Sequence, residues 1–227
     1  GRYGEVVDSI DREIIYYDEA HTVGGTLVTD TTWTNAQSPL LVTEDVIVPA
    51  GMTLTIEQGV NLRFHRNARI LSSGAVHIQG IEANPVHITS DDCDESRGYV
   101  DVIGADGSLV VQHARFKGAV CRLSQSAWGL IEDSIFEGGS EASISAVEAG
   151  YLEVRRSDFL SAYQPILAEG TQVVVDECRF AGSQNDAILL GGDSVWTVES
   201  VKIAEQATAP VDPPASAITS IQGELST

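Results

Sequence analysis

The stretch RFHRNAR, residues 63–69, gathers four basic or titratable side chains in a chain that is otherwise strongly acidic. They are Arg63, His65, Arg66 and Arg69. The chain has 33 acidic residues against 13 Lys and Arg, and its formal net charge is −20. Guanidinium and imidazolium groups donate hydrogen bonds to carboxylates and other anions. The stretch is therefore a candidate binding site for an acidic ligand.

A second stretch, SDDCDESRG at residues 90–98, has the opposite charge and could bind a cation. Its four carboxylates belong to Asp91, Asp92, Asp94 and Glu95. Hard cations such as Ca²⁺ take six to eight oxygen ligands on flexible loops. The stretch does not have the spacing of an EF-hand loop. It predicts either part of a Ca²⁺ site or a solvated acidic loop, and the sequence requires no other cofactor.

The composition excludes several classes of protein. Nucleic-acid binders carry a basic stripe that displaces counterions, and a hold on anionic lipids also needs basic residues. No apolar run of 18 residues occurs, so no membrane insertion is expected. Aromatic residues make up only 6 % and Met occurs once, which disfavours a helical bundle. The frequent Gly, Val, Ile and Thr favour short strands.

The elements that must position these residues recur along the chain. Five segments align: SLVVQHARFKG (108–118), GLIEDSIFEGG (129–139), YLEVRRSDFLS (151–161), QVVVDECRFAG (172–182) and VWTVESVKIAE (195–205). Each ends near an apolar anchor, namely Phe116, Phe136, Phe159, Phe180 and Ile203. Each also has an earlier apolar strand position, namely Val111, Ile131, Val154, Val175 and Val198. A period of 20 to 23 residues predicts a solenoid with one coil per repeat.

The earlier chain extends this pattern. MTLTIEQGVNLRF (52–64) and GAVHIQGIEANPVHITS (74–90) alternate in the same way, with Phe64 and Ile88 as anchors and an insertion near residues 90–98. The leucine-rich repeat shares the period but needs a Leu-x-x-Leu-x-Leu pattern, which is absent. The sequence therefore predicts an all-β fold, a right-handed parallel β-helix solenoid of about seven coils.

The opening coils resemble a known architecture. TDTTWTNAQSPLLVTEDVIVPAGMTLTIEQGV, followed by PVHITS, resembles the start of bacterial secreted and surface proteins with right-handed parallel β-helix repeats, the pectate-lyase-like superfold. The resemblance rests on Trp33 and Pro39 and on the turn G-x-T-L-T-I-x-x-G-V from Gly51 to Val60. It covers roughly residues 24–205. It implies the fold and an extracellular or cell-surface location, but no particular activity.

Three parts of the chain are expected. Residues 1–23 form an N-terminal lead-in or cap, residues 24–205 the β-helix domain, and residues 206–227 a Pro-rich linker or wrap at the C-terminus. The chain opens without a signal peptide. It is expected to be a segment of a larger protein with neighbouring domains.

The solenoid places the basic residues on an outward ladder. In each coil the residues flanking the anchor point away from the core. Aligning the anchors therefore predicts a paired stripe made of Arg63, His65, His87, Arg115 and Lys117. This stripe is the candidate ligand-binding site for an acidic glycan or a carboxylate-rich surface protein. Alternatively, it neutralises acidic columns beside it, such as Glu132, Asp176 and Glu199.

The three cysteines do not form a zinc-binding pair. Cys178 lies in a column of small residues and is expected to be buried. Cys93 and Cys121 fall in corresponding parts of successive coils, which lie about 4.8 Å apart. They could form a disulfide, or all three thiols could be reduced.

No catalytic motif of the β-helix enzymes is complete. Of the polygalacturonase-like motifs only Asp-Asp occurs, at Asp91–Asp92, and no G-x-S-x-G is present. No catalytic residue is therefore assigned. The sequence favours a non-catalytic extracellular module, a stalk, adhesion or carbohydrate-binding segment. The alternative is a polysaccharide-active lyase or hydrolase, or a degenerate remnant of one.

Overall fold

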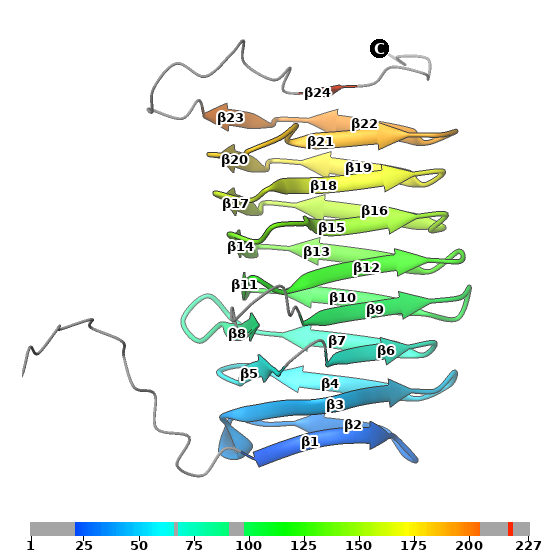
Figure 1. The fold of residues 1–227 in the computed structure, drawn as a ribbon, viewed down its shortest axis with the longest axis vertical. Coiled ribbons are helices and arrows are strands. Elements are labelled where there is room, and N and C mark those ends of the chain that lie inside the picture. The colour runs from blue at the N-terminus through cyan, green and yellow to red at the C-terminus, as the bar shows by residue number, and fades with distance from the viewer. Residues whose placement is uncertain (1–20, 66–67, 91–97, 205–217, 220–227) are drawn as a thin grey trace, which may run out of the picture.

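The alternating segments are short parallel β-strands that wind into a right-handed β-solenoid (Figure 1). This is seen in a computed structural model that describes residues 21–65, 68–90, 98–204 and 218–219. Each complete coil contributes one strand to each of three columns. The front strands in Figure 1 run to the right and the rear strands to the left as the chain climbs, which makes the winding right-handed.

The first column is an eight-stranded parallel sheet. It consists of β2 (Thr31–Trp33), β4 (Thr53–Glu57), β7 (Ala75–Gln79), β10 (Ser108–Gln112), β13 (Trp128–Glu132), β16 (Tyr151–Arg155), β19 (Gln172–Asp176) and β22 (Val195–Glu199). Its eight rungs correspond to about eight coils, close to the seven expected. The extra coil is the one that begins with β2, which lies before the aligned repeats.

The second and third columns are joined through the long strand β3 (Leu40–Val48), which also pairs with β1 (His21–Thr26). The second column contains β5 (Asn61–Phe64), β8 (Val86–Ser90), β11 (Ala114–Lys117), β14 (Ile135–Glu137), β17 (Asp158–Leu160), β20 (Arg179–Ala181) and β23 (Lys202–Ala204). The third contains β6 (Arg69–Ser72), β9 (Tyr99–Ile103), β12 (Val120–Ser124), β15 (Ala142–Val147), β18 (Gln164–Glu169), β21 (Ile188–Gly191) and β24 (Ile218–Thr219).

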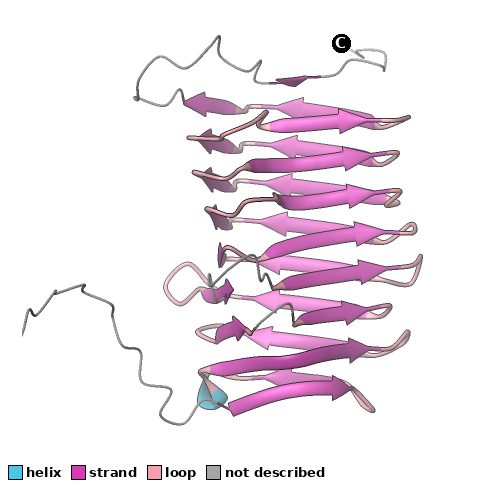
Figure 2. Cartoon of the chain, viewed as in Figure 1, coloured by secondary structure: helices cyan, strands magenta, loops and turns pink. Residues whose placement is uncertain are grey.

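Helix is confined, in the described part of the chain, to the 3-10 turn η1 (Asn35–Gln37) between β2 and β3 (Figure 2). No helix there is long and apolar enough to span a membrane. Strand pairing already begins at His21, before the expected domain boundary at residue 24. Ile218–Thr219 pairs in parallel with β21, so this part of the expected tail lies on the solenoid.

The core consists of columns of like residues, as the repeat predicts. The rings of Phe116, Phe136, Phe159 and Phe180 stack at centroid distances of 4.7, 5.0 and 4.9 Å, with planes within 8° of parallel. The strand positions Val111, Ile131, Val154, Val175 and Val198 are also in register. Because every coil repeats the same inward positions, apolar area is buried continuously along the axis.

The bend from the first to the second column explains the column of small residues. Five non-glycine residues take the left-handed conformation there: His113, Asp133, Arg156, Glu177 and Ser200, with φ between 46° and 53°. After the bend, the Ser134 hydroxyl accepts the backbone N–H of Ala114 at 3.1 Å, and the Ser157 hydroxyl accepts that of Ser134 at 3.2 Å. Small polar side chains thus satisfy backbone groups that the bend removes from the strand ladder.

The register of the first coils differs from the expected one. Phe64 and Ile88 were aligned as anchors, but Ile88 pairs with Leu62, and Phe64 pairs with Ser90. The Phe64 ring instead occupies the space beside Gly98, where a Cβ atom would meet it at 2.2 Å. The expected register is wrong because the bend from the first to the second column contains more residues between β7 and β8 than between the later strand pairs. The anchor of this coil is therefore Leu62.

Candidate functional site

The predicted basic residues lie on the outward face of β5, β8 and β11, with one exception. His87 and Arg115 are direct neighbours in one row of this face. Arg63 and Lys117 belong to the other row, where Thr89 lies between them. His87, Arg115 and Lys117 are exposed, and Arg63 is half-buried. These four residues are called the basic face below.

His65 does not belong to this face. The expected pairing of Arg63 with His87 and of His65 with Thr89 is wrong, because it used Phe64 as the anchor. His65 follows the end of β5, and its backbone N–H donates to the carbonyl oxygen of Val42 at 2.9 Å. The row that contains His87 begins with Asn61 instead.

Three residues of the basic face, His87, Arg115 and Lys117, differ from most of the described arginines in their pairing. Five described arginines form ion pairs with carboxylates: Arg69, Arg122, Arg155, Arg156 and Arg179. No ion pair of the described residues involves His87, Arg115 or Lys117. Among the described residues, no carboxylate therefore neutralises the charges of Arg115 and Lys117 by a direct contact.

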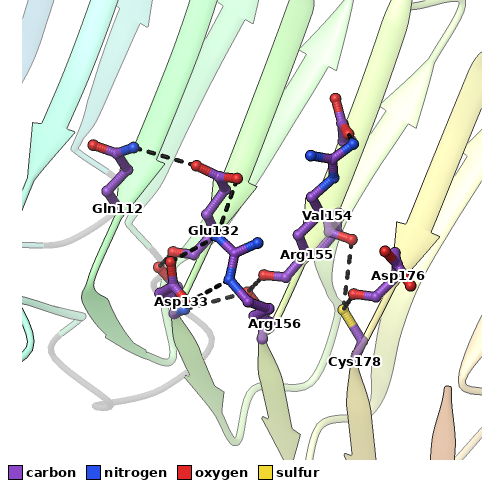
Figure 3. Close-up of polar contacts among 11 residues, drawn as sticks. Gln112, Glu132, Asp133, Val154, Arg155, Arg156, Asp176 and Cys178 are labelled. Carbon is purple, nitrogen blue, oxygen red and sulfur yellow. Dashed lines mark hydrogen bonds and ion pairs between the residues drawn. The ribbon is translucent and has the colours of Figure 1, made fainter. Parts of the chain in front are cut away.

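The alternative role of the stripe is to neutralise acidic columns beside it, and of the acidic residues named for it only Glu132 has its partners described here. The carboxylate of Glu132 pairs with Arg156 at 3.2 Å and accepts a hydrogen bond from the Gln112 amide at 3.2 Å (Figure 3). Arg155 lies between Glu132 and Asp176 in the same row. Glu132 is therefore paired with Arg156 and not with the stripe, whereas Asp176 and Glu199 still allow the alternative role.

The proposed cation site falls on residues outside the described part of the chain. Asp91, Asp92, Asp94 and Glu95 all lie in the segment 91–97. Among the described residues, no group of three or more His, Cys, Asp or Glu side chains is arranged to hold a metal ion. A Ca²⁺ role for residues 91–95 stays a prediction.

The cysteines are core residues where they are described. Cys178 is buried, as expected, and burial raises the pKa of its thiol to about 11. Cys121 is a fully buried free thiol between Val100 and Ile144, and burial raises its pKa further. Such thiols are poor nucleophiles. Cys93 lies outside the described residues, so its disulfide with Cys121 stays a prediction.

Sequence reasoning missed a charged row on the outward face of the third column. Its members are Asp45, Arg69, Asp101, Arg122 and Glu141. Arg69 contacts Asp45 at 2.9 Å and Asp101 at 3.6 Å, and Arg122 contacts Glu141 at 3.0 Å. The Arg122 guanidinium also lies 3.7 Å from the centre of the Tyr99 ring, a cation–π contact. The charged row is a network across several coils and not a single register row, because Arg69 is level with Tyr99, whereas Asp101 is level with Leu71 and Arg122.

Asp101 is the most desolvated carboxylate of this row. It is 8 % exposed although it lies on the outward face, and its Oδ1 atom has no hydrogen-bond partner. Burial raises the pKa of its carboxyl above the ordinary value, while the charges of Arg122 and Arg69 act in the opposite direction. In the sequence YVDVI of β9, Asp101 is a charged residue flanked by apolar ones. This pattern could have identified it as a buried carboxylate.

A surface depression adjoins the charged row. It has a volume of about 440 Å³. Its lining combines apolar Val120, Ala142 and Leu167 with Arg122, Ser140, Glu141, Ser145, Tyr163 and Gln164. The Tyr163 side chain is 40 % exposed. The size lies in the range of small-molecule sites, roughly 300–1,000 Å³.

Comparison with known proteins does not extend the description: no family model matches the chain, and no curated protein or solved structure matches it significantly. The resemblance of residues 24–205 to secreted β-helix proteins therefore stays an expectation. The strand pairing itself establishes the architecture. The chain is a parallel β-solenoid of about eight turns.

Proposed function

We propose that this chain is a non-catalytic β-helix module of a secreted or cell-surface protein, and that it binds an acidic glycan or a carboxylate-rich partner through the basic face. The proposal is supported by one observation above all. His87, Arg115 and Lys117 are exposed on neighbouring strands and form no ion pair with another described residue, in a chain whose net charge is −20.

The spacing of these charges favours cooperation. Successive coils lie about 4.8 Å apart, so neighbouring side chains of the basic face lie within one Debye length, about 8 Å at physiological ionic strength. A linear polyanion could contact several of them at once. Arg115 can bind a carboxylate in a bidentate manner, whereas Lys117 acts as a point charge.

The solenoid also suits a stalk or adhesion role. Each coil contacts only its neighbours, so the stack forms a rod with long faces. Such a rod separates neighbouring domains and presents repeated contacts to an extended partner. A supporting role for Ca²⁺ bound by residues 91–95 belongs to the same proposal.

The proposal is tested with immobilised polygalacturonate as the acidic glycan and dextran as the neutral control. The double variant Arg115→Ala/Lys117→Ala is expected to weaken binding to polygalacturonate about tenfold, because two contacts of roughly 0.5–1 kcal/mol each are lost. Raising the salt concentration should also weaken the binding of the wild-type protein to polygalacturonate, because salt screens the charges. Equal binding by wild type and double variant would contradict the proposal.

The matched control is Lys202→Ala. Lys202 is exposed in the same column of strands as Arg115 but lies four rungs away. Its loss removes one charge without touching the basic face, so polygalacturonate binding should stay close to the wild-type level. Repeating the assay with a chelator separates a Ca²⁺-dependent contribution from that of the basic face.

A second candidate function is a polysaccharide-active enzyme or its remnant. It is favoured by the buried carboxyl of Asp101, because desolvated carboxylates beside arginines are common in active sites. The test is the release of reducing ends or unsaturated products from polygalacturonate. Activity that disappears in Asp101→Asn would favour the enzyme over the binding module.

A further inference from the structure

We propose that the depression beside Arg122 and Tyr163 is a second ligand site, which binds an uncharged pyranose residue of a glycan. It lies on the third column, between β12, β15 and β18, and not on the strands of the basic face. The site therefore adds to the function proposed above and does not depend on it.

The geometry provides the two kinds of contact that a sugar ring needs. Tyr163 is an exposed aromatic ring at the wall, and Val120, Ala142 and Leu167 provide apolar surface. An aromatic ring packs against the apolar C–H face of a pyranose and keeps a polar hydroxyl of its own in water. Gln164 and Ser145 add side chains that can both donate and accept hydrogen bonds.

The pair formed by Arg122 and Glu141 suits two neighbouring hydroxyl groups. Their side chains meet at 3.0 Å and remain 40 % and 42 % exposed. A guanidinium donates and a carboxylate accepts, so vicinal hydroxyls can bond to both members. The cation–π contact with Tyr99 fixes the guanidinium before a ligand arrives, which lowers the entropy lost on binding.

The charge balance decides against an anionic ligand at this depression. The charged row contains three carboxylates, Asp45, Asp101 and Glu141, against the two guanidinium groups of Arg69 and Arg122. Arg122 and Glu141 are the charged residues in the lining of the depression, and they already pair with each other, so a ligand carboxylate would have to displace Glu141 from Arg122. A neutral polyol has no such cost.

The test is titration of the whole chain with cellohexaose, xylohexaose, mannohexaose and maltohexaose, followed by protein NMR or calorimetry. At least one of them is expected to bind with a dissociation constant of about 1 mM or tighter. Tyr163→Ala should weaken that binding roughly tenfold, whereas Tyr163→Phe should retain it, because stacking needs the ring. Gln164→Ala should weaken it by a smaller factor.

The matched control is Trp128→Ala, which removes an aromatic ring of equal exposure, 39 % against 40 % for Tyr163, from the outward face of the first column. This variant and Arg115→Ala/Lys117→Ala should bind the neutral oligosaccharide like the wild type. Conversely, Tyr163→Ala should bind polygalacturonate normally. The inference is overturned if none of the four oligosaccharides binds, or if Tyr163→Ala binds as tightly as the wild type.

Discussion

Arg156 clamps Asp133 of the preceding coil with two hydrogen bonds. Its Nε atom donates to Oδ1 of Asp133 at 2.8 Å, and its Nη2 atom donates to Oδ2 at 2.9 Å (Figure 3). Both residues occupy the left-handed bend between the first and second columns, with φ of 46° and 50°. Because each coil has the same bend, two side chains that are distant in sequence meet at this corner.

This clamp makes stability depend on pH. The hydrogen bond from Arg156 lowers the pKa of the Asp133 carboxyl. A lowered pKa in the folded state means that the contribution is present above the unfolded pKa and is lost as the pH falls through the folded pKa. Arg156→Gln should reduce the free energy of unfolding by about 1 kcal/mol at neutral pH, measured in urea, and by less in acid.

The control for the clamp is Arg115→Gln. Arg115 is an exposed arginine that forms no ion pair within the described part of the chain, so its replacement should leave the free energy of unfolding nearly unchanged at either pH. A similar loss in both variants would mean that the clamp contributes nothing beyond the removal of a positive charge.

The phenylalanine stack should dominate stability in the middle of the rod. Phe136 is 1 % exposed and lies between Phe116 and Phe159. Phe136→Ala should lower the free energy of unfolding by about 3–5 kcal/mol in urea denaturation, because it removes apolar contacts and leaves a cavity. The outward neighbour Ile135 is half-buried, and Ile135→Ala should cost about 1 kcal/mol or less. Equal losses would contradict the stacked core.

Asp101 should give a pH dependence of the opposite sign to Asp133. Burial raises the pKa of its carboxyl in the folded state above the unfolded value of about 3.8. The folded protein then binds the proton more tightly, so this group adds stability as the pH falls through the folded pKa towards the unfolded one. Urea unfolding between about pH 7 and about pH 4 should show this gain in the wild type and not in Asp101→Asn. The control is Asp106→Asn, which removes an exposed carboxylate. If this variant changes the pH dependence of unfolding as much as Asp101→Asn does, the burial of Asp101 is not the cause.

The thiols provide a chemical test of the core. Iodoacetamide without reductant should leave Cys121 and Cys178 unmodified in the native protein, because both are buried. After denaturation, still without reductant, mass spectrometry should find both alkylated. Recovery of a linked Cys93–Cys121 peptide would contradict the free thiol at Cys121 and would support the disulfide considered from the sequence.

The sequence was informative wherever a residue type recurred at the repeat. Phe116, Phe136, Phe159 and Phe180 were aligned by spacing alone and do stack in the core. Cys178 was assigned to the core from its column of small residues, and it is buried. These predictions hold because each later bend has almost the same length, so sequence spacing equals spatial register.

The first coils show why the rest could not be predicted. Leu62 and Phe64 both point inward, so alternation is equally satisfied by either as the anchor. A slip of one residue would expose the core, but a slip of two keeps every side chain on its own face. The pattern therefore placed Arg63 outward correctly but could not decide whether His87 or Thr89 lies beside it.

The sequence by itself determined the architecture: the period of the apolar residues specifies a solenoid, and alternation specifies which side chains face its core. Only the tertiary structure decided which outward side chains meet. Contacts such as Arg156 with Asp133, or Arg122 with Tyr99 and Glu141, join different coils. They depend on the register between coils and on the orientation of each outward side chain, and the period of the apolar residues specifies neither.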